Sequence, residues 1–231
     1  MNAEPLILNI ETSTTMCSVA VSKGEELLAS RAIDTGYTHA ENLHLFISEA
    51  LKSAGCSPQH LSAVALSSGP GSYTGLRIGS SSAKGLCYAL SIPLITINTL
   101  QLMASTITQK DDDADVICAM LDAGRMEVYT AVFDKSLVMQ GQTQALVLDK
   151  TSIEYFRKWP RITFGGSGME KARMLLEKLK GSEFVPGVKP LAENMAVLST
   201  KGFRSKNFTQ ISDFEPFYLK NFMAGKKKTN N

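Results

Sequence analysis

The sequence predicts an α/β protein built from a duplicated β-β-β-α-β-α unit that forms two lobes. Three observations favour this fold class. Short apolar runs typical of buried strands alternate with segments of helical periodicity. The same order of elements restarts near residue 110, and a glycine-rich turn follows a strand in each half ("SSGPGS" and "GGSG"). We therefore expect two mixed sheets flanked by helices.

The first half is predicted to contain five strands and three helices. The run "LILNI" is continuously apolar, and "CSVAVS" and "LLASRAI" follow it as a meander. Apolar residues then recur at helical spacing up to Ala54, where Gly55 provides a C-terminal stop. In chain order, the expected strands are 6–10, 17–22, 27–33, 61–67 and 93–97, and the expected helices are 40–54, 74–90 and 100–108.

The second half repeats this order after the polar, acidic run "KDDDAD". The expected strands are 116–121, 127–133, 144–149 and 161–166, and the expected helices are 152–159 and 169–180. We place the lobes at 1–109 and 110–224, with the C-terminal segment free to pack back on the first lobe. Residues 225–231, which include three consecutive lysines, are expected to form a disordered basic tail.

The composition of the chain limits the classes of function that it can have. The formal net charge of +2 is too small to indicate nucleic-acid binding by charge alone. The four cysteines are far apart in sequence, and Cys17, Cys87 and Cys118 have apolar neighbours, which predicts buried reduced thiols instead of a zinc site or disulfides. No signal peptide and no membrane span are predicted, so we expect a cytoplasmic protein.

The segment "SSGPGSYTGLRIGSSSAKGLCYAL" does not match a phosphate-binding loop. Gly75 precedes Leu76 and Arg77, whereas a P-loop requires lysine and a hydroxyl residue after its last glycine. A dinucleotide site needs an acid about 20 residues further on, and no Asp or Glu lies between Ala50 and Lys110. Both nucleotide motifs are therefore excluded.

Small residues recur at every fourth position of the helix in this segment: Gly75, Gly79, Ala83 and Cys87. Glycine within a helix costs up to about 1 kcal/mol relative to alanine, so two glycines indicate close approach of another element. That element could lie in the same lobe or on another subunit, and the pattern does not choose between them.

Few residues of this chain suit catalysis. His39, His44 and His60 do not have the spacing of a helical metal pair, and we interpret them as solvated side chains. Glu11 and Asp122 each end the first strand of their repeat, so they could face one another across the cleft between the lobes and hold magnesium or act as acid and base. The favoured alternative is that each carboxylate caps its own strand-end turn through local hydrogen bonds.

Four motifs together resemble the bacterial TsaB (YeaZ-type) family of threonylcarbamoyladenosine biosynthesis proteins: "LNIETST…CSVAV", "SSGPGSYTGLRIG…KGL", "LDAGRMEVY" and "PFYLKN". The resemblance extends from about Leu6 to Asn221. Glu11 stands where this family commonly has Asp, and "DAGRM" departs from the usual D-A-R-M-G order. The resemblance implies a glycoprotease-like member of the actin-like ATPase superfamily, with two ribonuclease-H-like lobes.

The resemblance also implies a role. Members of this family lack the metal-binding histidines of the related catalytic subunit TsaD. They bind TsaD, and the complex with the ATPase TsaE transfers a threonylcarbamoyl group to an adenosine beside the tRNA anticodon. The contact with TsaD would use the first-lobe helices, here 40–54 and 74–90, and the same surface could pair two copies of the isolated chain. The expected interface residues are Leu43, Ile47, Gly75, Leu76, Gly79, Ala83 and Leu86.

Two rival hypotheses remain at this stage. The chain could be an enzyme in its own right, either a nucleotide-dependent kinase or a glycoprotease-type metallopeptidase, with Glu11, Thr12 and Asp122 as its cleft candidates. Alternatively, ATP or ADP could bind at the partner interface and regulate assembly without any turnover.

Overall fold

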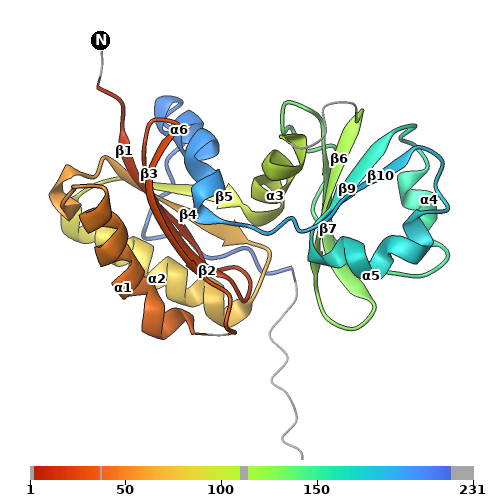
Figure 1. The fold of residues 1–231 in the computed structure, drawn as a ribbon, viewed down its shortest axis with the longest axis horizontal. Coiled ribbons are helices and arrows are strands. Elements are labelled where there is room, and N and C mark those ends of the chain that lie inside the picture. Colours follow the sequence, from red (N-terminus) through yellow and green to blue (C-terminus); the bar gives the residue numbers. More distant parts are fainter. Residues whose placement is uncertain (1–2, 37, 110–113, 220–231) are drawn as a thin grey trace, which may run out of the picture.

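The structure is a computed structural model that describes residues 3–36, 38–109 and 114–219. It consists of two lobes that lie side by side, each with a five-stranded mixed sheet (Figure 1). The predicted α/β class and the two-lobe arrangement are confirmed. The acidic run at residues 110–113 and the lysine tail lie outside the described residues, so the expected lobe boundary and the tail stay predictions.

The first sheet has the order β3-β2-β1-β4-β5. The meander pairs antiparallel, and β4 and β5 then join β1 in parallel. Its strands are β1 (Leu6–Glu11), β2 (Cys17–Lys23), β3 (Glu26–Ile33), β4 (Ala63–Gly69) and β5 (Leu94–Asn98), and the helices of this half are α1 (His39–Ser53), the 3-10 helix η1 (Pro58–His60), α2 (Tyr73–Leu90) and α3 (Thr99–Thr108).

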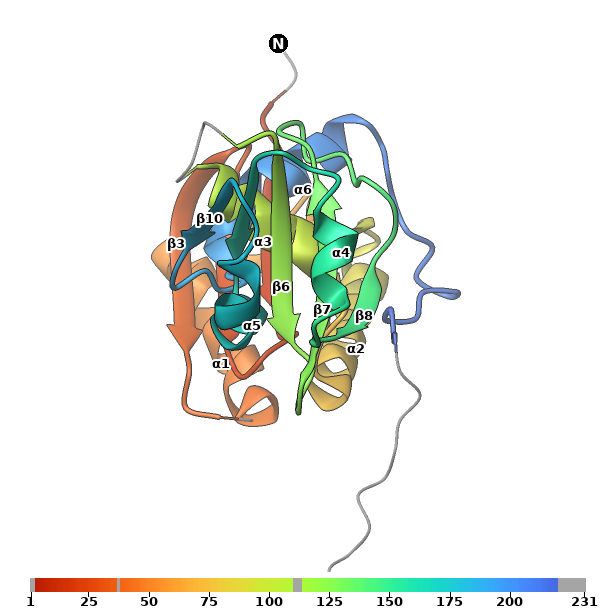
Figure 2. The ribbon, with the colours of Figure 1, turned by 90° about the vertical axis from the view of Figure 1, so that its right-hand side faces the viewer.

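The second sheet repeats this topology in the order β10-β9-β6-β7-β8. Here β6 pairs antiparallel with β7 and parallel with β9, as β1 does with β2 and β4. Figure 2 turns this second lobe toward the viewer. Its elements are β6 (Val116–Asp122), β7 (Glu127–Phe133), β8 (Gln144–Val147), α4 (Ser152–Phe156), β9 (Ile162–Gly165), α5 (Ser167–Leu176), β10 (Ser182–Val185), the 3-10 helix η2 (Ala192–Met195) and α6 (Ala196–Arg204).

Three elements, β10, η2 and α6, lie beyond the last helix that the sequence predicts, so the duplicated unit is longer than expected. With them, the second repeat gains a fifth strand and a final helical segment, which match β5 and α3 of the first repeat. The expected helices 152–159 and 169–180 are also shorter in the structure, because α4 ends at Phe156 and α5 at Leu176.

Both sheets are covered on both faces, and the covering helices are exchanged between the repeats. One face of the first sheet packs against α1 and α2. Its other face packs against η2 and α6, which come from the end of the chain. In return, α3 from the first half packs against β6 of the second sheet and lies between the lobes (Figure 1).

The predicted burial of three cysteines is confirmed. Cys17, Cys87 and Cys118 are buried and free. Burial raises the pKa of the Cys17 and Cys87 thiols to about 11 and that of Cys118 to about 12. Among the described residues, no helix combines the length and apolar character that crossing a membrane requires.

Candidate functional site

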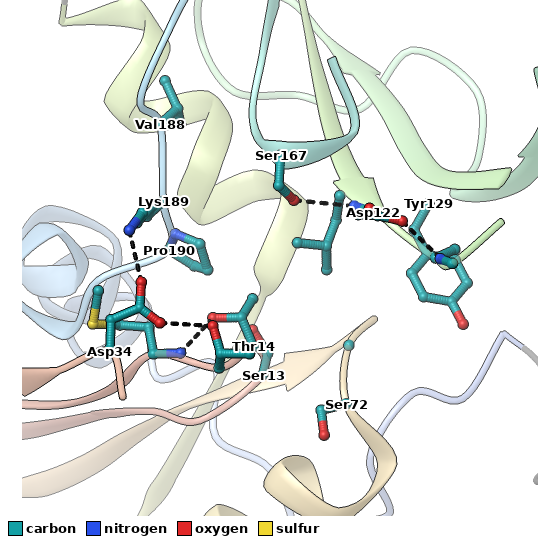
Figure 3. Close-up of a pocket in the computed structure, with 16 residues that line it drawn as sticks. Ser13, Thr14, Asp34, Ser72, Asp122, Tyr129, Ser167, Val188, Lys189 and Pro190 are labelled. Atoms are coloured by element: carbon teal, nitrogen blue, oxygen red, sulfur yellow. Dashed lines mark hydrogen bonds and ion pairs between the residues drawn. The ribbon is translucent and has the colours of Figure 1, made fainter. Parts of the chain in front are cut away.

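The duplicated fold creates a cleft of about 590 Å³ between the lobes. Each repeat contributes the turn after its first strand and the start of the helix after its fourth strand. The first repeat thus supplies the turn 13–16 and the Gly71–Ser72 entrance to α2, and the second supplies the turn after β6 and Ser167 at the start of α5 (Figure 3). Equivalent backbone positions of the two repeats therefore line opposite walls.

Local hydrogen bonds fix the first wall. Ser72, whose side chain caps α2, donates its backbone N–H to the Ser13 carbonyl oxygen at 2.6 Å. The Thr14 hydroxyl oxygen accepts the Met16 N–H at 3.1 Å. The turn after β1 is therefore tied both to itself and to the N-terminal end of α2.

A cation and a carboxylate meet on the first wall. Lys189 Nζ donates to Asp34 Oδ2 at 2.7 Å, and the Thr15 hydroxyl donates to Asp34 Oδ1 at 2.7 Å (Figure 3). These bonds lower the pKa of Asp34 below its ordinary value, chiefly through the hydrogen bond from Lys189. Because Lys189 follows β10 and Asp34 follows β3, the pair joins the two halves of the chain. Sequence reasoning missed both residues, since no local pattern links positions so far apart.

The second wall carries a similar pair. Lys171 Nζ donates to Asp122 Oδ1 at 2.5 Å and to the Arg125 carbonyl oxygen at 3.0 Å. The Gly124 N–H also donates to Asp122 Oδ1, at 2.7 Å. Partial burial acts to raise the pKa of Asp122, but the bonds from Lys171 and Gly124 outweigh it, so the pKa lies below its ordinary value. Asp122 is therefore ionised at neutral pH, and its carboxylate is bound by Lys171 and by the Gly124 N–H.

Glu11 does not face Asp122, which corrects one of the two alternatives for these acids. Its carboxyl group is wholly buried in the first lobe, accepts the Ser13 N–H at 2.5 Å and accepts the Ser67 hydroxyl. Burial raises the pKa of Glu11, although the hydrogen bonds from Ser13 and Ser67 act in the opposite direction. Both acids accept an N–H from two residues further on, so the favoured alternative of local strand-end caps is the one that the structure shows.

The three cleft candidates Glu11, Thr12 and Asp122 therefore do not come together. Thr12 is fully buried, its Oγ1 has no hydrogen-bond partner, and neither Thr12 nor Glu11 lines the cleft, whereas Asp122 does. The charged side chains that line it are Asp34, Asp122 and Lys189, and Lys171 adjoins them. Two carboxylates and two ammonium groups cancel, so these four side chains add no net charge to the cleft.

The histidine interpretation needs one correction. His39 is only 1 % exposed, and its Nε2 lies 3.3 Å from the Met16 carbonyl oxygen, so it is a buried residue at the start of α1. The other two lie at the surface, as expected: His44 Nε2 lies 3.2 Å from Ser82 Oγ, and His60 Nδ1 accepts the Ser57 N–H at 3.2 Å. Within the described ranges, no group of three His, Cys, Asp or Glu side chains is placed to hold a metal.

The expected interface residues are mostly buried inside the chain, which is a second correction. Leu43, Ile47, Gly75, Leu76, Gly79 and Ala83 are all buried, and only Leu86 is partly exposed. The two glycines explain why. A Cβ on Gly75 would overlap the Thr12 carbonyl oxygen, and one on Gly79 would overlap the Thr12 hydroxyl. The close approach that the small residues indicate is therefore to the end of β1 in the same lobe.

The faces of α1 and α2 that point away from the sheet carry the exposed apolar side chains instead. Leu45 on α1 is 53 % exposed and Tyr88 on α2 is 80 % exposed. Between these helices lies a groove of about 310 Å³ lined by His44, Ser81, Ser82, Gly85 and Leu86.

Comparison with known proteins places this architecture in one family. The family profile of TsaD, tRNA N6-adenosine threonylcarbamoyltransferase, matches residues 34–214. The tRNA threonylcarbamoyladenosine biosynthesis protein TsaB of Escherichia coli is 31 % identical, over 96 % of this chain and 97 % of that protein. Among solved structures, YeaZ from Pseudomonas aeruginosa matches with a TM-score of 0.80 at 23 % identity, over 93 % of this chain and all of that one. The activator of 2-hydroxyisocaproyl-CoA dehydratase from Clostridium difficile, with bound ADPNP, has a TM-score of 0.53 at 10 % identity, over 95 % of this chain and all of that one, and shares the fold alone.

Proposed function

The chain belongs to the TsaB (YeaZ-type) family of tRNA threonylcarbamoyladenosine biosynthesis proteins, and we propose that it acts as a noncatalytic partner subunit. Its role lies in tRNA threonylcarbamoyladenosine biosynthesis. In the proposed assembly, the chain binds and supports the catalytic subunit TsaD together with the ATPase TsaE, and it meets tRNA through that complex.

One observation carries the noncatalytic assignment: the two strand-end acids do not form a pair. Glu11 is buried in the core of the first lobe, and the ionised Asp122 forms an ion pair with Lys171. Acid and base chemistry shared between these two carboxyl groups would need both of them to face the same ligand. The arrangement supports a scaffold subunit over a stand-alone kinase or metallopeptidase.

The partner surface that we propose is the outward face of α1 and α2. The two helices are adjacent, they cover one face of the first sheet, and each presents a large apolar side chain to solvent. Exposed apolar side chains that gather around a groove are typical of protein–protein contact sites. This surface takes the place of the buried residues that the sequence favours.

The test is reconstitution with purified components. We expect the chain alone to turn over neither ATP nor tRNA, to form a complex with the cognate TsaD in size-exclusion chromatography, and to be required for threonylcarbamoyl transfer by TsaD and TsaE. Calorimetric titration of Mg-ATP into the chain, into TsaD and into their mixture shows which of the three binds the nucleotide. Turnover by the purified chain alone would show that it is an enzyme in its own right.

A further inference from the structure

The groove between α1 and α2 is lined by a glycine that no contact within the described residues requires. Gly85 of α2 lines the groove together with His44 of α1 and Ser82 of α2, and His44 Nε2 lies 3.2 Å from Ser82 Oγ. Gly85 is an exposed residue in the interior of an 18-residue helix. A Cβ added there would meet no atom of the described residues within 4 Å, unlike one on Gly75 or Gly79.

Glycine at such a position weakens the helix without benefit to the isolated chain. Relative to alanine it destabilises an exposed helix interior, whereas Gly75 and Gly79 permit close packing on Thr12, the residue after β1. A methyl group on Gly85 would occupy part of the groove. The missing side chain therefore creates space for an atom group from outside the chain.

The surroundings of the groove are those of a contact site. Tyr88 follows Gly85 by one helical turn on the same side of α2 and is 80 % exposed. Leu86 lines the groove. In protein–protein interfaces, exposed tyrosines beside small apolar depressions often contribute a large share of the binding free energy.

The charge around the groove has one sign on α2. This helix carries Arg77 and Lys84 and no acidic residue, and no Asp or Glu occurs between Ala50 and Lys110. Lys84 Nζ donates to the Phe214 carbonyl oxygen at 3.1 Å, so Arg77 is the exposed cation of α2. Arg77 is exposed, with its guanidinium 4.5 Å from the centre of the Tyr73 ring. On the facing helix, Glu41 is exposed near His44, while Glu49 is held by Arg31 at 3.0 Å. If α2 met α2 of a second copy, Arg77 would face another helix without acidic residues, whereas a partner helix with a carboxylate at that place would attract Arg77.

We infer that the groove over Gly85 receives one bulky apolar side chain of a partner helix, and that this helix carries a carboxylate about two turns away that faces Arg77. This inference rests on the proposed function, because it specifies how the α1–α2 face would meet the threonylcarbamoyltransferase subunit. Gly85 sets the fit, and Arg77 selects the charge of the partner.

The experiment measures binding of the cognate TsaD to the full chain and to two variants at Gly85. Gly85→Ala should raise the thermal midpoint of the isolated chain by about 1–4 °C, since it removes a helix-interior glycine at an open site. The same variant should weaken TsaD binding, and Gly85→Trp should weaken it roughly ten- to hundredfold. A stabilised chain that binds less well separates this role from damage to the fold.

Arg77→Glu and Met174→Trp complete the design. Arg77→Glu should slow association most strongly at low salt. Met174→Trp adds bulk at a position of α5 that is 83 % exposed on the second lobe, and it should leave binding unchanged.

Each outcome decides one question. If the unmodified chain fails to bind TsaD, the proposed function and this inference both fall. If the unmodified chain binds and both Gly85 variants bind equally well, only the inference falls. Loss of self-association with TsaD binding intact would show that the groove serves a second copy instead.

Discussion

Glu11 and Asp122 occupy the same place in the two repeats, at the ends of β1 and β6, yet Glu11 is fully buried whereas the Asp122 side chain is 48 % exposed. The lengths of the neighbouring strands explain the difference. β4 runs to Gly69, beyond its pairing with Ile10, and so brings Ser67 beside Glu11. β9 ends at Gly165, which pairs with Ala119, three residues before Asp122. A duplicated backbone therefore does not duplicate the chemistry of its strand ends.

The largest effect is expected from the glycines that lie beside these strand ends. Gly75→Ala should destabilise the chain by about 1–3 kcal/mol, because its Cβ would overlap the rigid Thr12 carbonyl oxygen. Gly168→Ala, near the start of α5, should cost less, since its Cβ would lie 2.7 Å from a Val128 methyl group and 3.0 Å or more from backbone carbons, whereas a Cβ on Gly75 would lie closer than either distance to the Thr12 oxygen. Urea unfolding followed by circular dichroism measures both. A larger loss of stability for Gly168→Ala than for Gly75→Ala would contradict the contrast between the buried end of β1 and the exposed end of β6.

The next effect is an opposite pH dependence of the two acids. The raised pKa of Glu11 means that its contribution to the free energy of unfolding is fully present below the ordinary Glu value of 4.5 and is lost as pH rises through the folded-state pKa. Glu11→Gln removes that loss, so the stability of the variant relative to the unmodified chain should increase with pH. Each unit of pKa difference corresponds to about 1.4 kcal/mol.

Asp122 should behave in the reverse sense. Its lowered pKa gives a contribution that is present above the ordinary Asp value of 3.8 and is lost as pH falls through the folded-state pKa. Because the side chain is half exposed, Asp122→Asn should cost less than about 1 kcal/mol at pH 7. Unfolding free energies of both variants between about pH 2 and pH 8 test the pair. Parallel slopes of the two variants would contradict the assignment of one buried acid with a raised pKa and one exposed acid with a lowered pKa.

The smallest effect concerns the ion pair that joins the repeats. Lys189→Ala removes a bridge to Asp34 whose side chains are 53 % and 33 % exposed, and it should change stability by less than about 1 kcal/mol. The difference should shrink further in 1 M salt, because exposed charges are screened. A loss of several kcal/mol that persists in high salt would mean that the repeats depend on this contact more than on their exchanged helices.

Periodicity predicted the elements of the fold where the pattern was long and regular. The run "EVYTAVF" corresponds to β7 residue for residue, and α2 begins one residue before its predicted start. β10 has four residues followed closely by Pro186, too short for a periodic signal. α6 contains Gly202 and packs on the first sheet, so its pattern does not reveal its place in the fold.

The candidate site was less predictable, because its geometry depends on contacts distant in sequence. The sequence indicates that Glu11 ends a strand, but its direction depends on Ser67, 56 positions away. The small residues of α2 indicate a close contact, but only the fold shows that Thr12 makes it. Gly85 lies outside the series of small residues at every fourth position, so that pattern does not mark it, and only the fold shows that it lies on the exposed side of α2.

The exchange of α3 and α6 has a consequence for how this polypeptide can be divided. A fragment that stops after residue 109 would lack the cover that Met195 and Leu198 provide over Ile7, Ala65 and Ile95, and its α3 would have no second sheet to pack against. The remainder would leave the α3-facing side of β6 and β7 bare. Each fragment expressed alone should aggregate, and soluble material should return when the two are co-expressed, because each half completes the hydrophobic interior of the other.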